Sequence, residues 1–224
     1  MSQVARRASA AEISLVLGLP TAIFLAGCVV ALMRGPGSVV FTDARLLRIT
    51  AEEAITAALF LPFLRHRGWT PDAIGGAPEP MDVVRGGLVC LGSYVAYYLA
   101  FVALLSLAPS WGTTLQATRI GGSVSVPVAV VTALLNPLFE EFLWLGYGVS
   151  ALEPRIGLRG ACIVSVVLRV AVHSYQGPMA LVGIAPMAVV FTWYYARTGR
   201  LWPLIVAHVI GDAAAFGVLA ASKH

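Results

Sequence analysis

The stretch Leu135–Gly148, LNPLFEEFLWLGYG, carries two adjacent glutamates, Glu140 and Glu141, within a long apolar run. The run covers residues 121–152 and contains no other formally charged residue. It is long enough for a membrane-crossing helix, which needs about 20 mostly apolar residues. A charge near the bilayer centre costs on the order of 2.5–3.5 kcal/mol, so such residues usually face a polar interior and mark function. The pair therefore needs a structural or chemical reason.

The composition predicts an integral membrane protein. Of the 224 residues, 58% are hydrophobic and only 12% are charged, whereas a soluble domain carries about twice that charged fraction. We expect one integral-membrane domain over residues 1–224, with the lipid bilayer as a partner. The arginines are scattered, so no nucleic-acid partner is predicted. Cys28, Cys90 and Cys162 lie far apart in apolar runs, which favours buried thiols over a disulfide or zinc site.

Apolar runs between charged or Pro and Gly breaks predict an all-α, multi-pass bundle of roughly seven transmembrane helices, with six to eight as the range. Weak alternation argues against strands. In the first run LAGC resembles a lipoprotein cleavage box, but the run continues beyond it and favours a transmembrane helix. The expected spans are 13–33, 51–64, 86–107, 124–149, 162–173, 179–195 and 201–219.

The arginines also predict orientation, because cytoplasmic loops carry an excess of them. With Arg6 and Arg7 at a cytoplasmic N-terminus, the loops at 65–85, 155–159 and 197–200 lie on the same side. The opposite side then holds fewer arginines. They are Arg34, Arg45, Arg48 and Arg119.

A second acidic pair, Glu52 and Glu53, has a structural interpretation. It lies in RITAEEAI, where Thr50 is placed to be an N-cap and Glu53 the fourth residue of a capping box. The positive end of the helix dipole also favours acids in the first turn. We therefore expect this pair to stabilise a helix start.

Glu140 and Glu141 lie too far into their span for that explanation. Adjacent helical residues point about 100° apart, so one can face a cavity while the other pairs with a neighbouring helix. Asn136 lies one turn before Glu140 on the same face, and Pro137 is expected to loosen the backbone there. From this segment alone, a buried pair without chemistry fits equally well.

Two histidines in apolar spans favour chemistry. His173 follows Arg169 by four residues, and His208 precedes Asp212 by four, so each pair shares a helix face. A buried glutamate can act as general base toward water, and a histidine can orient that water or take its proton. A second histidine can stabilise an oxyanion. The same residue types could instead bind a metal ion, although no HExxH motif is present.

Three segments in this order resemble the motifs of the CAAX protease and bacteriocin-processing (CPBP, or Abi) family. They are EEFLWLGYG, HSYQG and RTGRLWPLIVAHVIGD, which together cover about residues 136–214. The run R-T-G-x-L-W-P-x-x-x-x-H before a final helix is the most characteristic. The family consists of multi-pass membrane proteins that include prenyl-protein endopeptidases. The resemblance places the motif-bearing core at about 124–219.

The family pattern is EExxxR, FxxxH and HxxxN or HxxxD. The resemblance implies that Glu140 activates water, that Glu141 supports it and that His173 works with Glu140. His208 and Asp212 would polarise the substrate or stabilise the oxyanion. It also implies a glutamate-type protease without a metal cofactor, with zinc as the fallback.

Two positions depart from that pattern. Leu145 stands where the family has arginine, and Arg169 stands where it has phenylalanine. Because a buried arginine needs a carboxylate partner, we expect Arg169 to replace the missing guanidinium beside Glu141. The alternative is a divergent, weakly active member of the family.

The leading hypothesis is an intramembrane endopeptidase whose peptide or membrane-protein substrate enters laterally between helices. A non-catalytic immunity or scaffold protein of the same fold is the alternative. A proton-linked transporter built on the buried acids is a third class, disfavoured because no inverted repeat is visible.

Overall fold

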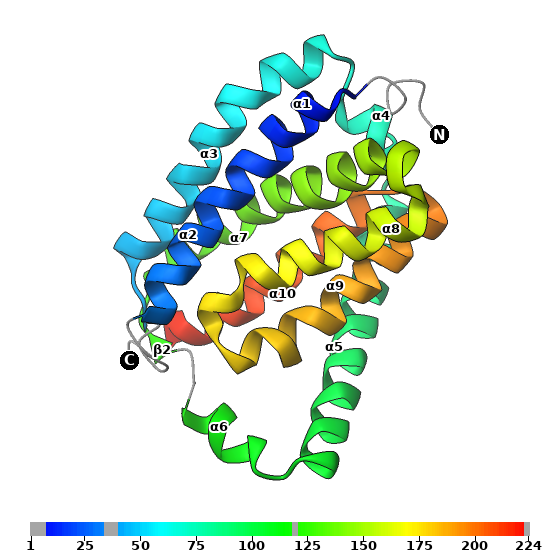
Figure 1. Ribbon diagram of the computed structural model, residues 1–224. Coiled ribbons are helices and arrows are strands. Elements are labelled where there is room, and N and C mark those ends of the chain that lie inside the picture. The colour runs from blue at the N-terminus through cyan, green and yellow to red at the C-terminus, as the bar shows by residue number, and fades with distance from the viewer. Residues whose placement is uncertain (1–7, 34–39, 118–120, 222–224) are drawn as a thin grey trace.

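The computed structural model describes residues 8–33, 40–117 and 121–221, and most of them lie in helices packed as one bundle (Figure 1). The expected all-α bundle is confirmed. The first three elements form one continuous helix, Ala10–Met33. The elements are α1 Ala10–Ile13, the π-helix η2 Ser14–Gly18, α2 Leu19–Met33, β1 Val40–Phe41, α3 Asp43–His66, α4 Pro71–Gly75, α5 Met81–Leu107, α6 Trp111–Ala117, β2 Gly121–Gly122, α7 Val126–Glu140, the π-helix η3 Glu141–Tyr147, α8 Gly148–Val172, the 3-10 helix η4 Ser174–Gln176, α9 Pro178–Thr198 and α10 Trp202–Ala221.

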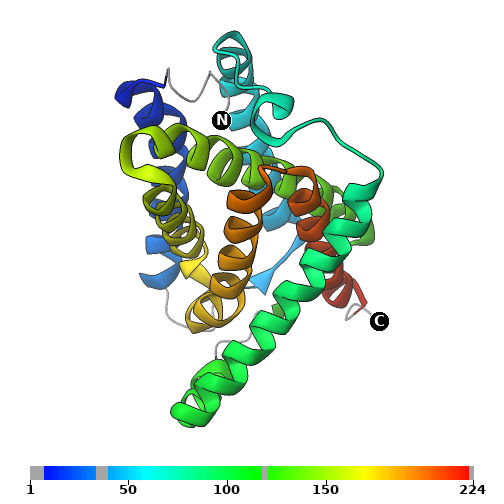
Figure 2. The same ribbon diagram turned by 90° about the vertical axis from the view of Figure 1, so that its right-hand side faces the viewer.

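Three of the described helices are long and apolar enough to cross a membrane. They are Ala10–Met33, Met81–Leu107 and Trp202–Ala221, with mean hydropathies of 2.4, 2.1 and 2.0. Many of their large apolar side chains point outward, as expected when lipid covers them. The second half of α5 projects beyond the other helices and ends beside α6 (Figure 2). The protein is therefore a membrane protein.

The structure corrects two expectations and confirms a third. The second span begins at Asp43 rather than at residue 51, because Thr42 caps the helix by accepting from the Arg45 N–H. The fourth and fifth spans are separate, as expected, because α8 consists of two helices joined at Gly157, where the backbone is not helical and a φ of 73° favours glycine. The second of these helices packs back on η3, with Ser165 donating to the Trp144 carbonyl. Two short strands, β1 and β2, are also present and pair in parallel.

The strand pair sets α3 and α7 side by side. Each helix begins just after one of the strands, and the Ser125 N–H donates to the Asp43 carboxylate at 2.6 Å. Further along, the Thr50 and Thr132 hydroxyls are hydrogen-bonded at 3.2 Å. The two helices therefore run in the same direction, and these contacts fix which residues of α3 lie beside which residues of α7.

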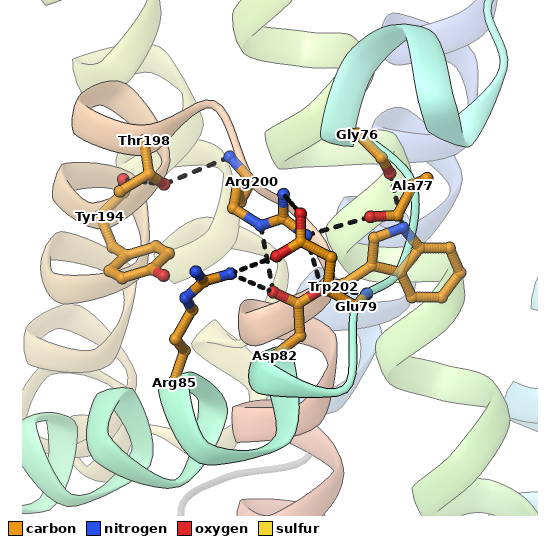
Figure 3. Close-up of polar contacts among 9 residues, drawn as sticks. All are labelled: Gly76, Ala77, Glu79, Asp82, Arg85, Tyr194, Thr198, Arg200 and Trp202. Atoms are coloured by element: carbon orange, nitrogen blue, oxygen red, sulfur yellow. Dashed lines mark hydrogen bonds and ion pairs between the residues drawn. The ribbon is translucent and has the colours of Figure 1, made fainter.

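A polar cluster fixes the turn between α9 and α10 to the start of α5 (Figure 3). Arg200 donates to both oxygens of Asp82, at 3.0 and 2.8 Å, and to Glu79 at 2.8 Å. Arg85 donates to the same two carboxylates. The Trp202 indole N–H donates to the Gly76 carbonyl at 2.7 Å. These bonds place the first turn of α10, the helix that carries His208.

Arginines from different loops gather at this end of the bundle, as the orientation argument requires. Besides Arg200, Arg67 pairs with Glu12 at 3.1 Å, and Arg155 donates to the Ala8 carbonyl at 2.9 Å. Arg6, Arg7, Arg34 and Arg119 lie outside the described residues. That this end faces the cytoplasm stays a prediction.

The packing of α5 on α10 can be tested with two adjacent glycines. A Cβ on Gly86 would lie 2.6 Å from the Val206 side chain and 2.8 Å from the Pro203 carbonyl, whereas one on Gly87 would meet nothing within 4 Å. Gly86→Ala should lower the free energy of unfolding by about 1–3 kcal/mol through overpacking. Gly87→Ala should leave it unchanged or raise it slightly. Thermal unfolding of both variants in detergent measures the difference, and equal stabilities would contradict this packing.

Candidate active site

Glu140 and Glu141 lie at the junction of two helix types, and their carboxylates have different surroundings. Glu140 ends α7 and Glu141 begins the π-helix η3. Glu140 is 5% exposed and lines a cavity of about 830 Å³, whereas Glu141 is fully buried. One glutamate therefore faces the cavity and the other faces neighbouring helices, as adjacent helical positions require.

Glu141 is held by two positively polarised groups from other helices. Arg169 Nη2 donates to Glu141 Oε2 at 2.7 Å, and His208 Nδ1 donates to Glu141 Oε1 at 2.7 Å. Arg169 is 2% exposed, and its guanidinium also lies 5.6 Å from the centre of the Phe191 ring. The ion pair expected between Arg169 and Glu141 is present.

Leu145, at the position of the family's arginine, supplies no polar group. It is 1% exposed and belongs to an apolar cluster with Phe191 and Leu204. The guanidinium that contacts Glu141 therefore comes from α8 and not from the helix that carries the glutamates.

Glu140 faces His173, which ends α8. His173 Nε2 lies 3.7 Å from Glu140 Oε1, and its Nδ1 lies 2.8 Å from the Arg169 carbonyl oxygen. A carbonyl only accepts, so Nδ1 carries a proton, which leaves Nε2 directed at Glu140. The remaining Glu140 oxygen, Oε2, is buried and has no hydrogen-bond partner among the described residues. Glu140 and His173 thus present free polar atoms to one space.

Asp212 faces the other side of His208. Its Oδ1 lies 3.6 Å from His208 Nε2, and its Oδ2 accepts from Asn136 Nδ2 at 3.1 Å. Asn136 shares the Glu140 face of α7 as expected, but its amide binds Asp212 on α10. The structure thus brings all seven residues singled out from the sequence into one group: Asn136, Glu140, Glu141, Arg169, His173, His208 and Asp212.

The π-helix η3 follows the two glutamates without a break. Such segments are rare and frequently occur at functional sites. Ser165 on α8 donates to the Trp144 carbonyl at 3.0 Å. A neighbouring helix thus satisfies a carbonyl in the altered turn. The sequence predicted a loosened backbone near Pro137, but not a π-helix.

The capping interpretation of Glu52 and Glu53 is wrong. Because α3 begins at Asp43, both residues lie well inside the helix, and Thr50 bonds Thr132 instead of capping. Glu52 is exposed and pairs with Arg48, whereas Glu53 is 3% exposed and lines the same cavity as Glu140. The segment FTDARLL could have shown the true helix start. In it, Thr42 is a suitable N-cap residue and is followed directly by an acid, as is typical of a first helical turn.

The site offers few free donors for the zinc alternative. Within the described ranges, no three His, Cys, Asp or Glu side chains are grouped so that they could hold a metal ion. Glu141 and His208 Nδ1 bind each other, and the second oxygen of Glu141 binds Arg169. A zinc site needs three or four converging donors, whereas Glu140 Oε2 and His173 Nε2 are the two that the preceding contacts leave free.

Comparison with known proteins finds one similar family. A family model described as Type II CAAX prenyl endopeptidase Rce1-like matches residues 122–214, somewhat less than half of the chain. No curated protein and no solved structure gives a significant match. The matched segment extends from β2 into α10 and contains every residue of the site predicted from the sequence. The resemblance is thereby confirmed over residues 122–214, which are similar to this family of prenyl endopeptidases.

The buried Arg169–Glu141 pair yields a stability prediction. Arg169→Leu leaves a buried carboxylate with one partner fewer, and breaking such a pair costs about 3–5 kcal/mol. Arg65→Leu is the control, because Arg65 is exposed near the end of α3 and should change stability by less than about 0.5 kcal/mol. Thermal unfolding of both variants in detergent makes the comparison. Similar unfolding midpoints would show that Arg169 does not carry the role assigned to it.

Proposed function

We propose that the protein is an intramembrane endopeptidase of the glutamate type. It hydrolyses a peptide bond of a membrane-associated substrate with a water molecule activated by Glu140 and His173. The observation that carries this proposal is the free Glu140 carboxylate oxygen in the cavity, next to a histidine whose other nitrogen is committed to a carbonyl. The family match supports protease activity in general.

In the proposed reaction a water molecule lies between Glu140 and His173 Nε2. Glu140 takes one proton while the water oxygen attacks the carbonyl carbon of the scissile bond, which gives a tetrahedral intermediate. His173 holds the water in line for the attack. When the intermediate collapses, the carbon–nitrogen bond breaks and Glu140 returns the proton to the leaving amine.

His208 is placed to stabilise the oxyanion. Its Nδ1–H donates to Glu141, and in the doubly protonated ring the Nε2–H donates to the developing negative charge. Glu141 and Asp212 lie on opposite sides of the ring and compensate a positive charge on it. Asn136 holds Asp212, and Arg169 holds Glu141, so these two residues position the ring without contacting substrate.

Three substitutions test the assigned roles. Glu140→Gln and His173→Ala should each lower kcat by about 10²–10⁴-fold, the usual contribution of a general acid–base group. His208→Ala should lower it by about 10²–10³-fold through the loss of an oxyanion donor. Asp72→Asn is the control, since Asp72 is exposed on α4 and does not line the cavity. Cleavage of membrane-anchored peptides by the purified protein measures these changes.

Wild-type cleavage by all three variants would end the protease proposal. No cleavage by any preparation, including the wild type, would favour the non-catalytic immunity or scaffold role of the same fold.

Metal removal gives a separate prediction. Treatment with a chelator such as EDTA or 1,10-phenanthroline should leave the cleavage rate unchanged, because the proposed reaction uses only side chains and water. The assay compares treated protein before and after addition of zinc. Activity that is lost with chelator and restored by zinc would replace the glutamate mechanism with a metal-dependent one.

A further inference from the structure

Glu53 is a buried acid that the proposed reaction does not use. It lies on α3, outside the segment that matches the family, and it lines the cavity that contains Glu140, His173 and Asp212. Its side chain is 3% exposed. It is thus a fourth acid at the candidate active site, supplied by a different part of the chain.

One oxygen of the Glu53 carboxylate is buried without a partner. It is Oε2, which makes no hydrogen bond to any of the described residues. A buried carboxylate is unfavourable unless it accepts hydrogen bonds or meets a positive charge. A group that enters the cavity with N–H donors would therefore gain binding energy at this position.

The hydrogen bond between Thr50 and Thr132 aligns α3 with α7, so the positions of Glu53 and Glu140 along the two helix axes can be compared from it. Glu53 lies three residues beyond Thr50, about 4.5 Å along α3, whereas Glu140 lies eight residues beyond Thr132, about 12 Å along α7. The two residues are therefore separated by about 7.5 Å along the helix axes. An extended peptide covers that distance in about two residues.

The cationic groups near the candidate active site are directed at acids other than Glu53. Glu141 is compensated by Arg169 and His208. On α3, Arg48 pairs with Glu52.

Arg45 does not neutralise Glu53. It lies eight residues before Glu53, or about 12 Å along the helix. Its guanidinium is 5.5 and 5.4 Å from the centres of the Phe41 and Tyr175 rings. Glu53 Oε2 thus has no arginine partner among the described residues, which favours a ligand that supplies N–H donors, such as a lysine or arginine side chain.

We infer that Glu53 forms a substrate subsite that binds a lysine or arginine side chain about two residues from the scissile bond. This inference rests on the proposed function, because it assigns a substrate preference to the same cavity. Glu53 would accept hydrogen bonds from the cationic group while the peptide backbone lies between His208 and Glu140.

The test uses the full-length protein in nanodiscs and a series of fluorescent, membrane-anchored peptides. A single lysine is moved along an otherwise uncharged sequence, and norleucine at the same position is the uncharged reference. Fluorescence anisotropy measures binding, and cleavage is followed separately. One lysine position should bind at least about tenfold more tightly than norleucine, as expected for a hydrogen-bonded charge in a buried site.

Glu53→Gln should remove that preference by raising KM for the lysine peptide to that of the norleucine peptide. Asp72→Asn, at an exposed position of α4 outside the cavity, should keep it. The inference is overturned if wild type prefers lysine at no position, an outcome that needs no variant to fold. It is also overturned if Glu53→Gln lowers kcat equally for both peptides, which would indicate proton transfer.

Failure of the proposed function gives a different result. Peptides would then bind without being cleaved by the wild type, and the anisotropy ratio between lysine and norleucine would still decide the role of Glu53.

Discussion

The site depends on one buried carboxylate, Glu141, which receives hydrogen bonds from Arg169 on α8 and His208 on α10. A carboxylate enclosed in a membrane protein needs such partners, so three helical segments must meet at this point. Their meeting fixes the ring of His208, and it leaves the adjacent Glu140 facing the cavity. The same contact brings the end of α8 close to α7, where His173 faces Glu140. The buried pair thus organises the chemistry without taking part in it.

The rest of the fold supports this arrangement from its two ends. At one end, Arg200 and Asp82 fix the turn that begins α10. At the other, the paired strands set α3 beside α7, so the chain outside the family match contributes a wall of the cavity. The π-helix lies between them, directly after the glutamates. The contacts that support the fold at its two ends therefore involve other residues than the proposed reaction. The proposed substrate preference depends on a further residue, Glu53 on α3.

Much of the fold could be predicted because its signals are local. Apolar runs gave the helices, and the rule that a buried arginine needs a carboxylate linked Arg169 to Glu141 across 28 residues of sequence. The role of Glu53 could not be predicted in this way. The residues around Glu53 also match a capping box, which would place it at a helix start. Because α3 begins at Asp43, Glu53 instead lies well inside the helix and within the bundle. The amide of Asn136 binds α10 rather than Glu140 because helix packing, which the sequence does not display, decides its partner. The π-helix likewise depends on a neighbouring helix that satisfies one of its carbonyls.

The central claim is that Glu140 activates water and is not itself the nucleophile. A single turnover of a membrane-anchored peptide in ¹⁸O-labelled water, with excess protein and mass analysis of both reactants, tests it most directly. The account predicts one ¹⁸O atom in the new peptide carboxylate and none in Glu140. Label in the Glu140 side chain would reveal a covalent intermediate and contradict the account.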